Sequence, residues 1–214
     1  MHAAKSMFSY ARAHLRIIAA VICAGFLTMA CGSGAGAEER VFIDPETGFR
    51  IDVPAPWHME TGEEMREMAR REAEAMDDPD LEFSEPGGPV EPLVRIRYYE
   101  SGKAPGPNPT LVVNRFDLDR FPPGMDELVL LQMGFAGAEI TSPPSTRNLQ
   151  GRTWNTLTAM RTINHPQGGS LDIMQTAYTA RDGRWAIGFV LSAAPEQMDA
   201  KRDAFEALLN AIRW

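Results

Sequence analysis

The last third of the chain alternates apolar and polar residues over long stretches, and this pattern constrains the fold more than any other feature. Side chains along a β-strand point to opposite faces in turn, so an alternating segment predicts a strand with one buried face. Arg181-Asp182-Gly183 separates two such segments, and Asp-Gly there is typical of a hairpin turn. The pattern predicts three consecutive antiparallel strands, at about residues 148–163, 170–180 and 184–192.

Shorter alternating segments predict strands earlier in the chain. Phe49, Ile51 and Val53 alternate with charged residues after a turn at residues 44–48. A short strand is expected just before this turn, and two more lie beside loops rich in Pro and Gly. The predicted strands are 41–43, 49–53, 94–98 and 111–117.

Apolar residues at helical spacing predict three helices. Thr61 followed by Glu64 is a capping-box pattern, which indicates a helix from Glu63 to about Met76. Pro and Gly at residues 122–124 introduce a second helix at 125–135, with one apolar face formed by Leu128, Leu131 and Phe135. A C-terminal helix that packs on the sheet is predicted from Met198, Phe205, Leu208, Leu209 and Ile212.

These elements together predict an α+β protein, in which helices flank an antiparallel β-sheet. Both cysteines, Cys23 and Cys31, precede the first strand, so the folded part forms no internal disulfide and depends on burial for its stability. A hydrophobic content of 44% is sufficient for a sizeable core. We expect a single domain over residues 41–214.

Three segments resemble the PsbP/DcrB-like superfamily: TGFRIDVPAPW at residues 47–57, LQGRTW at 149–154 and FEALLNAIRW at 205–214. The resemblance implies an α/β/α sandwich, an antiparallel sheet between helices. It also implies a non-enzymatic role, since members of this superfamily are mostly envelope lipoproteins, photosystem accessory subunits and secretion-effector chaperones. A shared fold transfers none of these roles by itself.

The N-terminus predicts export and lipid anchoring. Residues 1–30 carry three basic and no acidic residues before a short apolar run, the shape of a signal peptide. The run ends in Leu27-Thr28-Met29-Ala30-Cys31, which resembles the lipobox of bacterial lipoproteins. That resemblance implies a diacylglyceryl group, with further acylation such as palmitate, on Cys31 as the new N-terminus. The alternative is ordinary signal-peptide cleavage near Ala35-Gly36-Ala37, which would discard Cys31.

Residues 31–40 form a Gly- and Ser-rich flexible tether between the lipid and the domain. At about 3.3–3.6 Å per extended residue the tether reaches roughly 30 Å. The domain is therefore expected in the bacterial cell envelope, on the periplasmic side and close to one membrane leaflet. In a Gram-negative cell we expect the outer membrane.

Few residues of the mature chain suit catalysis or a cofactor. Only His58 and His165 remain after residue 30, and we expect both as ordinary turn or surface residues. A serine hydrolase that uses Ser170 beside His165 is conceivable, but glycines in a hairpin explain that segment without chemistry. No nucleophile elbow, zinc-protease helix or nucleotide-binding loop is present. We expect no enzyme and no cofactor.

Acidic residues are concentrated in residues 60–92, which hold 12 acids and 3 arginines, a net charge of −9. Without the three basic residues of the signal the whole chain carries −8 − 3 = −11, which disfavours nucleic-acid binding. The segment is predicted as a solvated helix and loop, with docking of a basic partner as the functional alternative. A loose cation site at Asp77, Asp78 and Asp80 is a further alternative, although the spacing excludes an EF-hand.

The sequence thus favours a lipid-anchored, non-catalytic accessory or binding protein that acts through protein–protein contacts. Two alternatives stay open. One is a small-ligand or divalent-cation-binding module of the periplasm, and the other is a hydrolase that uses His58 or His165.

Overall fold

The computed structural model describes residues 40–67, 70, 88–98, 108–164 and 170–214. Its centre is a seven-stranded antiparallel sheet in the order β3-β4-β5-β9-β8-β7-β6. The strands are β3 (Trp57–Thr61), β4 (Val90–Tyr98), β5 (Thr110–Asp117), β6 (Glu139–Leu149), β7 (Arg152–Asn164), β8 (Ser170–Asp182) and β9 (Trp185–Ala193). The predicted α+β class, an antiparallel sheet flanked by helices, is confirmed.

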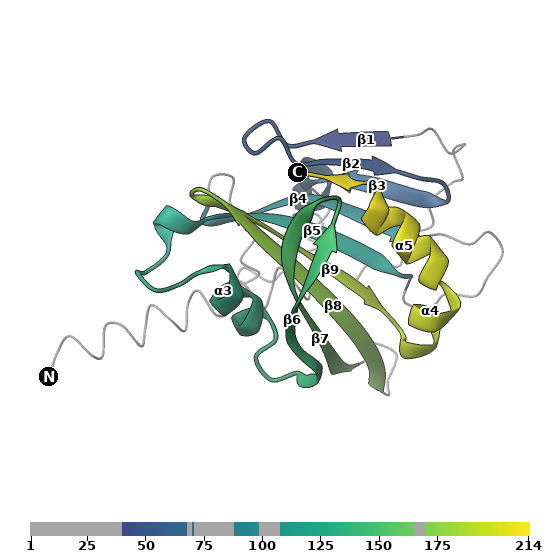
Figure 1. Ribbon diagram of the computed structural model, residues 1–214. Helices are drawn as coiled ribbons and strands as arrows, with labels where there is room; N and C mark the ends of the chain where they lie inside the picture. The colour runs from purple at the N-terminus through teal and green to yellow at the C-terminus, as the bar shows by residue number, and fades with distance from the viewer. Residues whose placement is uncertain (1–39, 68–69, 71–87, 99–107, 165–169) are drawn as a thin grey trace, which may run out of the picture.

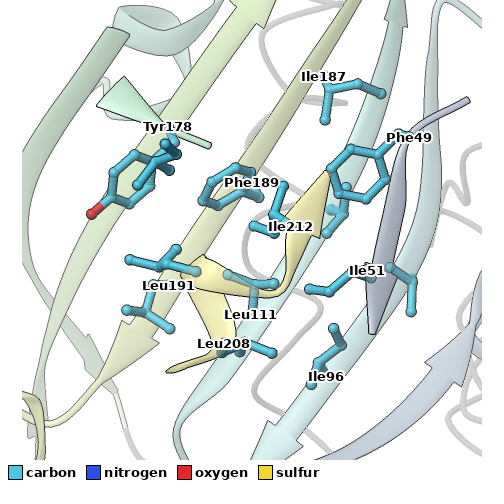
Figure 2. Packing of buried hydrophobic residues seen from close by; sticks show 14 of the residues in the cluster. Phe49, Ile51, Ile96, Leu111, Tyr178, Ile187, Phe189, Leu191, Leu208 and Ile212 are labelled. Carbon is cyan, nitrogen blue, oxygen red and sulfur yellow. The ribbon is translucent and has the colours of Figure 1, made fainter. Parts of the chain in front are cut away.

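One face of this sheet is covered by two helices and a small second sheet (Figure 1). The helices are α4 (Pro195–Ala200) and α5 (Arg202–Asn210), and the small sheet has the order β1-β2-β10, with β1 (Arg40–Ile43), β2 (Arg50–Val53) and β10 (Ile212–Arg213). Figure 2 shows how Phe49 and Ile51 lie with Ile212 and Leu208 against Phe189 of the large sheet. This cluster is the main core.

The other face carries α3 (Glu127–Gly134). Its Leu131 and Phe135 pack against Leu157, Ala159 and Ala177 of β7 and β8. The helix begins after Asp126, whose carboxylate accepts hydrogen bonds from the Leu128 and Val129 amides at 3.1 and 2.9 Å, an N-cap that satisfies two otherwise unpaired donors. The predicted helix at 125–135 and its apolar face are confirmed, with the start shifted by two residues.

The β8–β9 hairpin forms where Asp182-Gly183 predicted it. Asp182 pairs with Trp185, and Gly183 has φ +59°, a conformation that glycine adopts without steric cost. The alternating residues Ile187 and Phe189 are fully buried in the main core.

The predicted strand at 148–163 is wrong in one respect, because it spans two strands and the turn between them. β6 ends at Leu149, Gln150 and Gly151 turn with φ of 52° and 84°, and β7 begins at Arg152. The sequence pattern missed most of β6 because this strand is exposed and holds two prolines, Pro143 and Pro144. Proline is compatible with an edge strand, where its missing N–H faces no partner.

The prediction of a single C-terminal helix is also wrong. The helical spacing breaks near Lys201, so that α4 and α5 are separate, and Ile212 leaves the helix to pair with Ile51 in β10 and β2. Ile212 is buried in either case, which is why the apolar spacing alone did not distinguish the two.

The Thr61 capping box is confirmed. The Thr61 amide donates to the Glu64 carboxylate at 2.7 Å and the Glu64 amide donates to the Thr61 hydroxyl at 3.3 Å. Residues 62–67 are helical, and the remainder of the helix predicted to Met76 lies largely outside the described residues. The pattern did not predict β3, the strand directly before this cap.

Candidate functional site

Most of the site residues predicted from the sequence lie outside the described residues. These are Cys31, His165 and the three aspartates of the loose cation site, Asp77, Asp78 and Asp80. Their predictions stay untested. Within the described part of the chain, no three His, Cys, Asp or Glu side chains gather closely enough to hold a metal ion. None of the described helices has the length and apolarity needed to cross a bilayer.

The structure separates the two described residues of the hydrolase alternative. His58 is exposed on β3, an edge strand of the large sheet, where it lies opposite Arg97. Ser170 is exposed at the start of β8, and three strands lie between β3 and β8. His58 and Ser170 therefore lie on separate parts of the sheet, and the predicted pairing of Ser170 with His165 stays untested because His165 lies outside the described residues.

Among the described residues of the acidic segment, Glu60 and Glu91 form ion pairs with arginines of the large sheet. The Glu60 carboxylate accepts a hydrogen bond from Arg95 Nε at 2.5 Å and lies 3.6 Å from Arg97 Nε, which joins β3 to β4. The Glu91 carboxylate is 2.6 Å from Arg115 on β5. These two charges stabilise the sheet, so the net −9 of residues 60–92 overstates the charge that the segment can offer to a partner.

Arg115 also connects the two sheets. Its guanidinium donates to the Asp44 carboxylate at 2.7 Å and lies over the Trp185 ring, 4.8 Å from its centroid. Asp44 is 2% exposed and begins the β1–β2 turn, where it accepts a hydrogen bond from the Thr47 hydroxyl at 2.6 Å. The ion pair between Asp44 and Arg115 joins the small sheet to the large sheet.

A second polar cluster links the edge strand β6 to α5. Arg147 donates to the Glu206 carboxylate at 2.5 Å and to the Tyr178 hydroxyl at 3.3 Å. Burial raises the pKa of Tyr178, opposed in part by the positive charge of Arg147. The hydrogen bond to Glu206 raises the pKa of Arg147, which keeps this guanidinium charged. These contacts join the edge strand β6 to β8 and to α5.

A cavity of about 40 Å³ lies between α3 and the large sheet. Its floor is a cross-strand row of Asn114, Gly188 and Thr179, and its roof includes Leu130 and Leu131. Asn114 is 4% exposed, and its side-chain oxygen has no hydrogen-bond partner among the described residues. Since one water needs roughly 10–15 Å³, the cavity has room for about three.

The strand β1 presents an apolar outer surface. Val41 and Ile43 are 44% and 55% exposed and alternate with Phe42, which packs on the main core. Only one other large hydrophobic side chain of the described residues, Ile140 on β6, is comparably exposed, at 46%. We call Val41 and Ile43 the β1 surface. It directly follows the predicted tether, residues 31–40.

Within the described part of the chain, backbone groups of the β1 surface also lack a strand partner. β1 is an edge strand of the small sheet, at the top of the view in Figure 1. The Asp44 amide donates to the Phe49 carbonyl at 2.8 Å, and the Asp52 amide points the other way, to Ala211 at 3.3 Å. Backbone groups alternate in direction along a strand, so the amides and carbonyls of Val41 and Ile43 point to the open edge.

Known structures include several of similar architecture. The cyanobacterial PsbP (CyanoP) from Synechocystis sp. PCC 6803 matches with a TM-score of 0.49 and 14% identity, over 86% of this chain and 98% of that one. LpqN of Mycobacterium tuberculosis, which is involved in cell envelope biogenesis, matches with a TM-score of 0.43 and 11% identity, over 83% and 85%.

No protein-family model and no curated protein matches the chain. Similarity at 11–14% identity attaches no role to it. The fold class rests on the strand order and layers described above.

Sequence reasoning did not single out the β1 surface or Asn114. The sequence did hold a signal for the β1 surface, because Val41, Phe42 and Ile43 are three consecutive apolar residues in a predicted strand. Only alternate side chains of a strand share a face, so such a run exposes at least one apolar residue unless both faces are covered. Nothing local distinguished Asn114, which is one of several polar residues in its strand.

Proposed function

We propose that the protein is a lipid-anchored, non-catalytic accessory protein of the bacterial cell envelope that acts by binding another protein. The β1 surface carries the proposal. Two exposed apolar side chains on one edge strand are a feature that soluble proteins usually bury or cover with a partner. The sequence supports the location, since the lipobox at Cys31 and the short tether would hold β1 within about 30 Å of the membrane.

The anchoring is tested by labelling cells with palmitate. We expect label in the wild type and none in Cys31→Ser, because the thiol is the acylation site of a lipobox. Equal incorporation into both proteins, or into neither, would contradict the anchor.

The binding role is tested by photocrosslinking in intact cells. A photoreactive residue replaces Ile43 in one variant and Ile140 in the matched control, since both side chains are similarly exposed on edge strands. We expect position 43 to give one defined protein adduct that position 140 does not give. The same weak background from both positions would rule out protein binding at the β1 surface.

A further inference from the structure

We infer that the partner binds by strand addition: an extended segment of another protein pairs with the open edge of β1 and extends the small sheet. This inference rests on the proposed function and specifies its binding mode. The β1 surface offers two kinds of contact at the same residues. Val41 and Ile43 present exposed apolar side chains and also outward backbone amides and carbonyls.

The backbone groups determine the kind of partner. An open edge offers donors and acceptors spaced by two residues, which another strand can satisfy along its whole length. A lipid surface cannot do so, because its hydrocarbon interior offers no hydrogen-bonding groups. The contact area therefore fits an extended peptide segment better than a membrane.

The side chains determine the composition of that segment. Residues of a partner strand directly opposite Val41 and Ile43 lie about 4.5–5.5 Å away between Cβ atoms, so apolar or β-branched residues at alternate positions complement them. Beside them, Arg50 and Asp52 of β2 form an ion pair at 2.8 Å. The local surface is thus neutral and apolar, and the partner needs no charge at the paired positions.

Net charge argues against a second copy of this chain as the occupant. The mature chain carries −11, and a net charge far from zero disfavours the association of two identical copies. A neutral or basic segment of another protein is favoured by the same charge. Homodimerisation is then an outcome that the experiment distinguishes.

The positions of crosslinks on the partner test strand addition with the full-length protein in cells. Photoreactive residues are placed at position 41 and, separately, at position 43, and the attachment sites on the partner are identified by mass spectrometry. Strand pairing predicts sites on one protein that are about two residues apart, since opposite residues advance together along paired strands. Sites scattered over the partner would overturn strand addition but not the proposed binding role. Adducts with the same chain or with lipid would overturn the choice of partner.

A backbone substitution provides the second readout. Ile43→Pro removes an N–H that points to the open edge, while the β1–β2 bonds of Phe42 and Asp44 stay in place. We expect the adduct formed from position 41 to fall at least about tenfold, equivalent to about 1.4 kcal/mol of binding. Ile43→Thr keeps the amide and serves as the control for the lost apolar side chain, with a smaller expected loss. An undiminished adduct from a folded Ile43→Pro protein would refute strand pairing. If that variant does not fold, the spacing of the crosslinks decides.

Discussion

Asp44→Ala should destabilise the protein much more than Asp52→Ala, although each aspartate forms an ion pair of similar length. Asp44 lies 2.7 Å from Arg115, and Asp52 lies 2.8 Å from Arg50. The difference is burial: the Asp44 side chain is 3% exposed, whereas that of Asp52 is 36% exposed. The comparison therefore sets a buried aspartate, which also accepts from the Thr47 hydroxyl, against an exposed one.

The magnitude follows from what each substitution leaves behind. Removing one partner of a buried pair costs about 3–5 kcal/mol when the other charge becomes unpaired. Arg115 keeps Glu91 at 2.6 Å, so we expect a smaller cost for Asp44→Ala, about 2–3 kcal/mol, typical of a hydrogen bond to a charged group. For Asp52→Ala we expect less than about 1 kcal/mol, as for other surface pairs.

Urea unfolding of the two variants, each in a Cys31→Ser background that removes the lipid, measures both costs. The slope of the free energy of unfolding against urea should stay constant, so that the midpoints report stability. Equal losses in the two variants would refute the reasoning, since burial would then not decide the value of the pair.

Three further substitutions test the packing and the second polar cluster. Gly188→Ala should cost about 1–3 kcal/mol, because the new Cβ would lie 2.8 Å from Phe116 Cε2; thermal melts should show a partial rescue by Phe116→Leu. Leu208→Ala, at a position that is 0% exposed, should cost about 2–5 kcal/mol in urea unfolding. Since burial raises the pKa of Tyr178, the stability that it contributes is complete below the unfolded pKa of about 10 and is lost as pH rises further. Melts from pH 8 to 11 should show a smaller loss in Tyr178→Phe than in the wild type, and identical slopes would contradict the shift.

Features decided by neighbouring residues could be predicted well. The Asp182-Gly183 hairpin and the Thr61 capping box form as expected because each depends on backbone geometry and hydrogen bonds within a few residues. The apolar face of α3 was predictable for the same reason, since its spacing repeats with the helical turn.

The edge strands of the large sheet and the C-terminal segment were predicted poorly. β6 lies at the edge of the large sheet with most of its side chains exposed, so it lacks the alternation that marks a half-buried strand. Ile212 fits a helical pattern but pairs with Ile51, and the Trp214 indole donates to the Thr47 carbonyl at 3.0 Å. Both contacts join residues more than 150 positions apart, and no local pattern encodes them.

By itself, the sequence determined the local periodicities, the turns and the α+β class, and it predicts an exported, lipidated chain with Cys31 at its new N-terminus. The tertiary structure alone decided which faces of the predicted strands are covered. Phe42 is packed on the core while Val41 and Ile43 are exposed, because β1 pairs on one side only and the small sheet covers the large one with a single face. Three adjacent apolar residues look alike in the sequence, and only long-range packing separates the buried Phe42 from the exposed Val41 and Ile43.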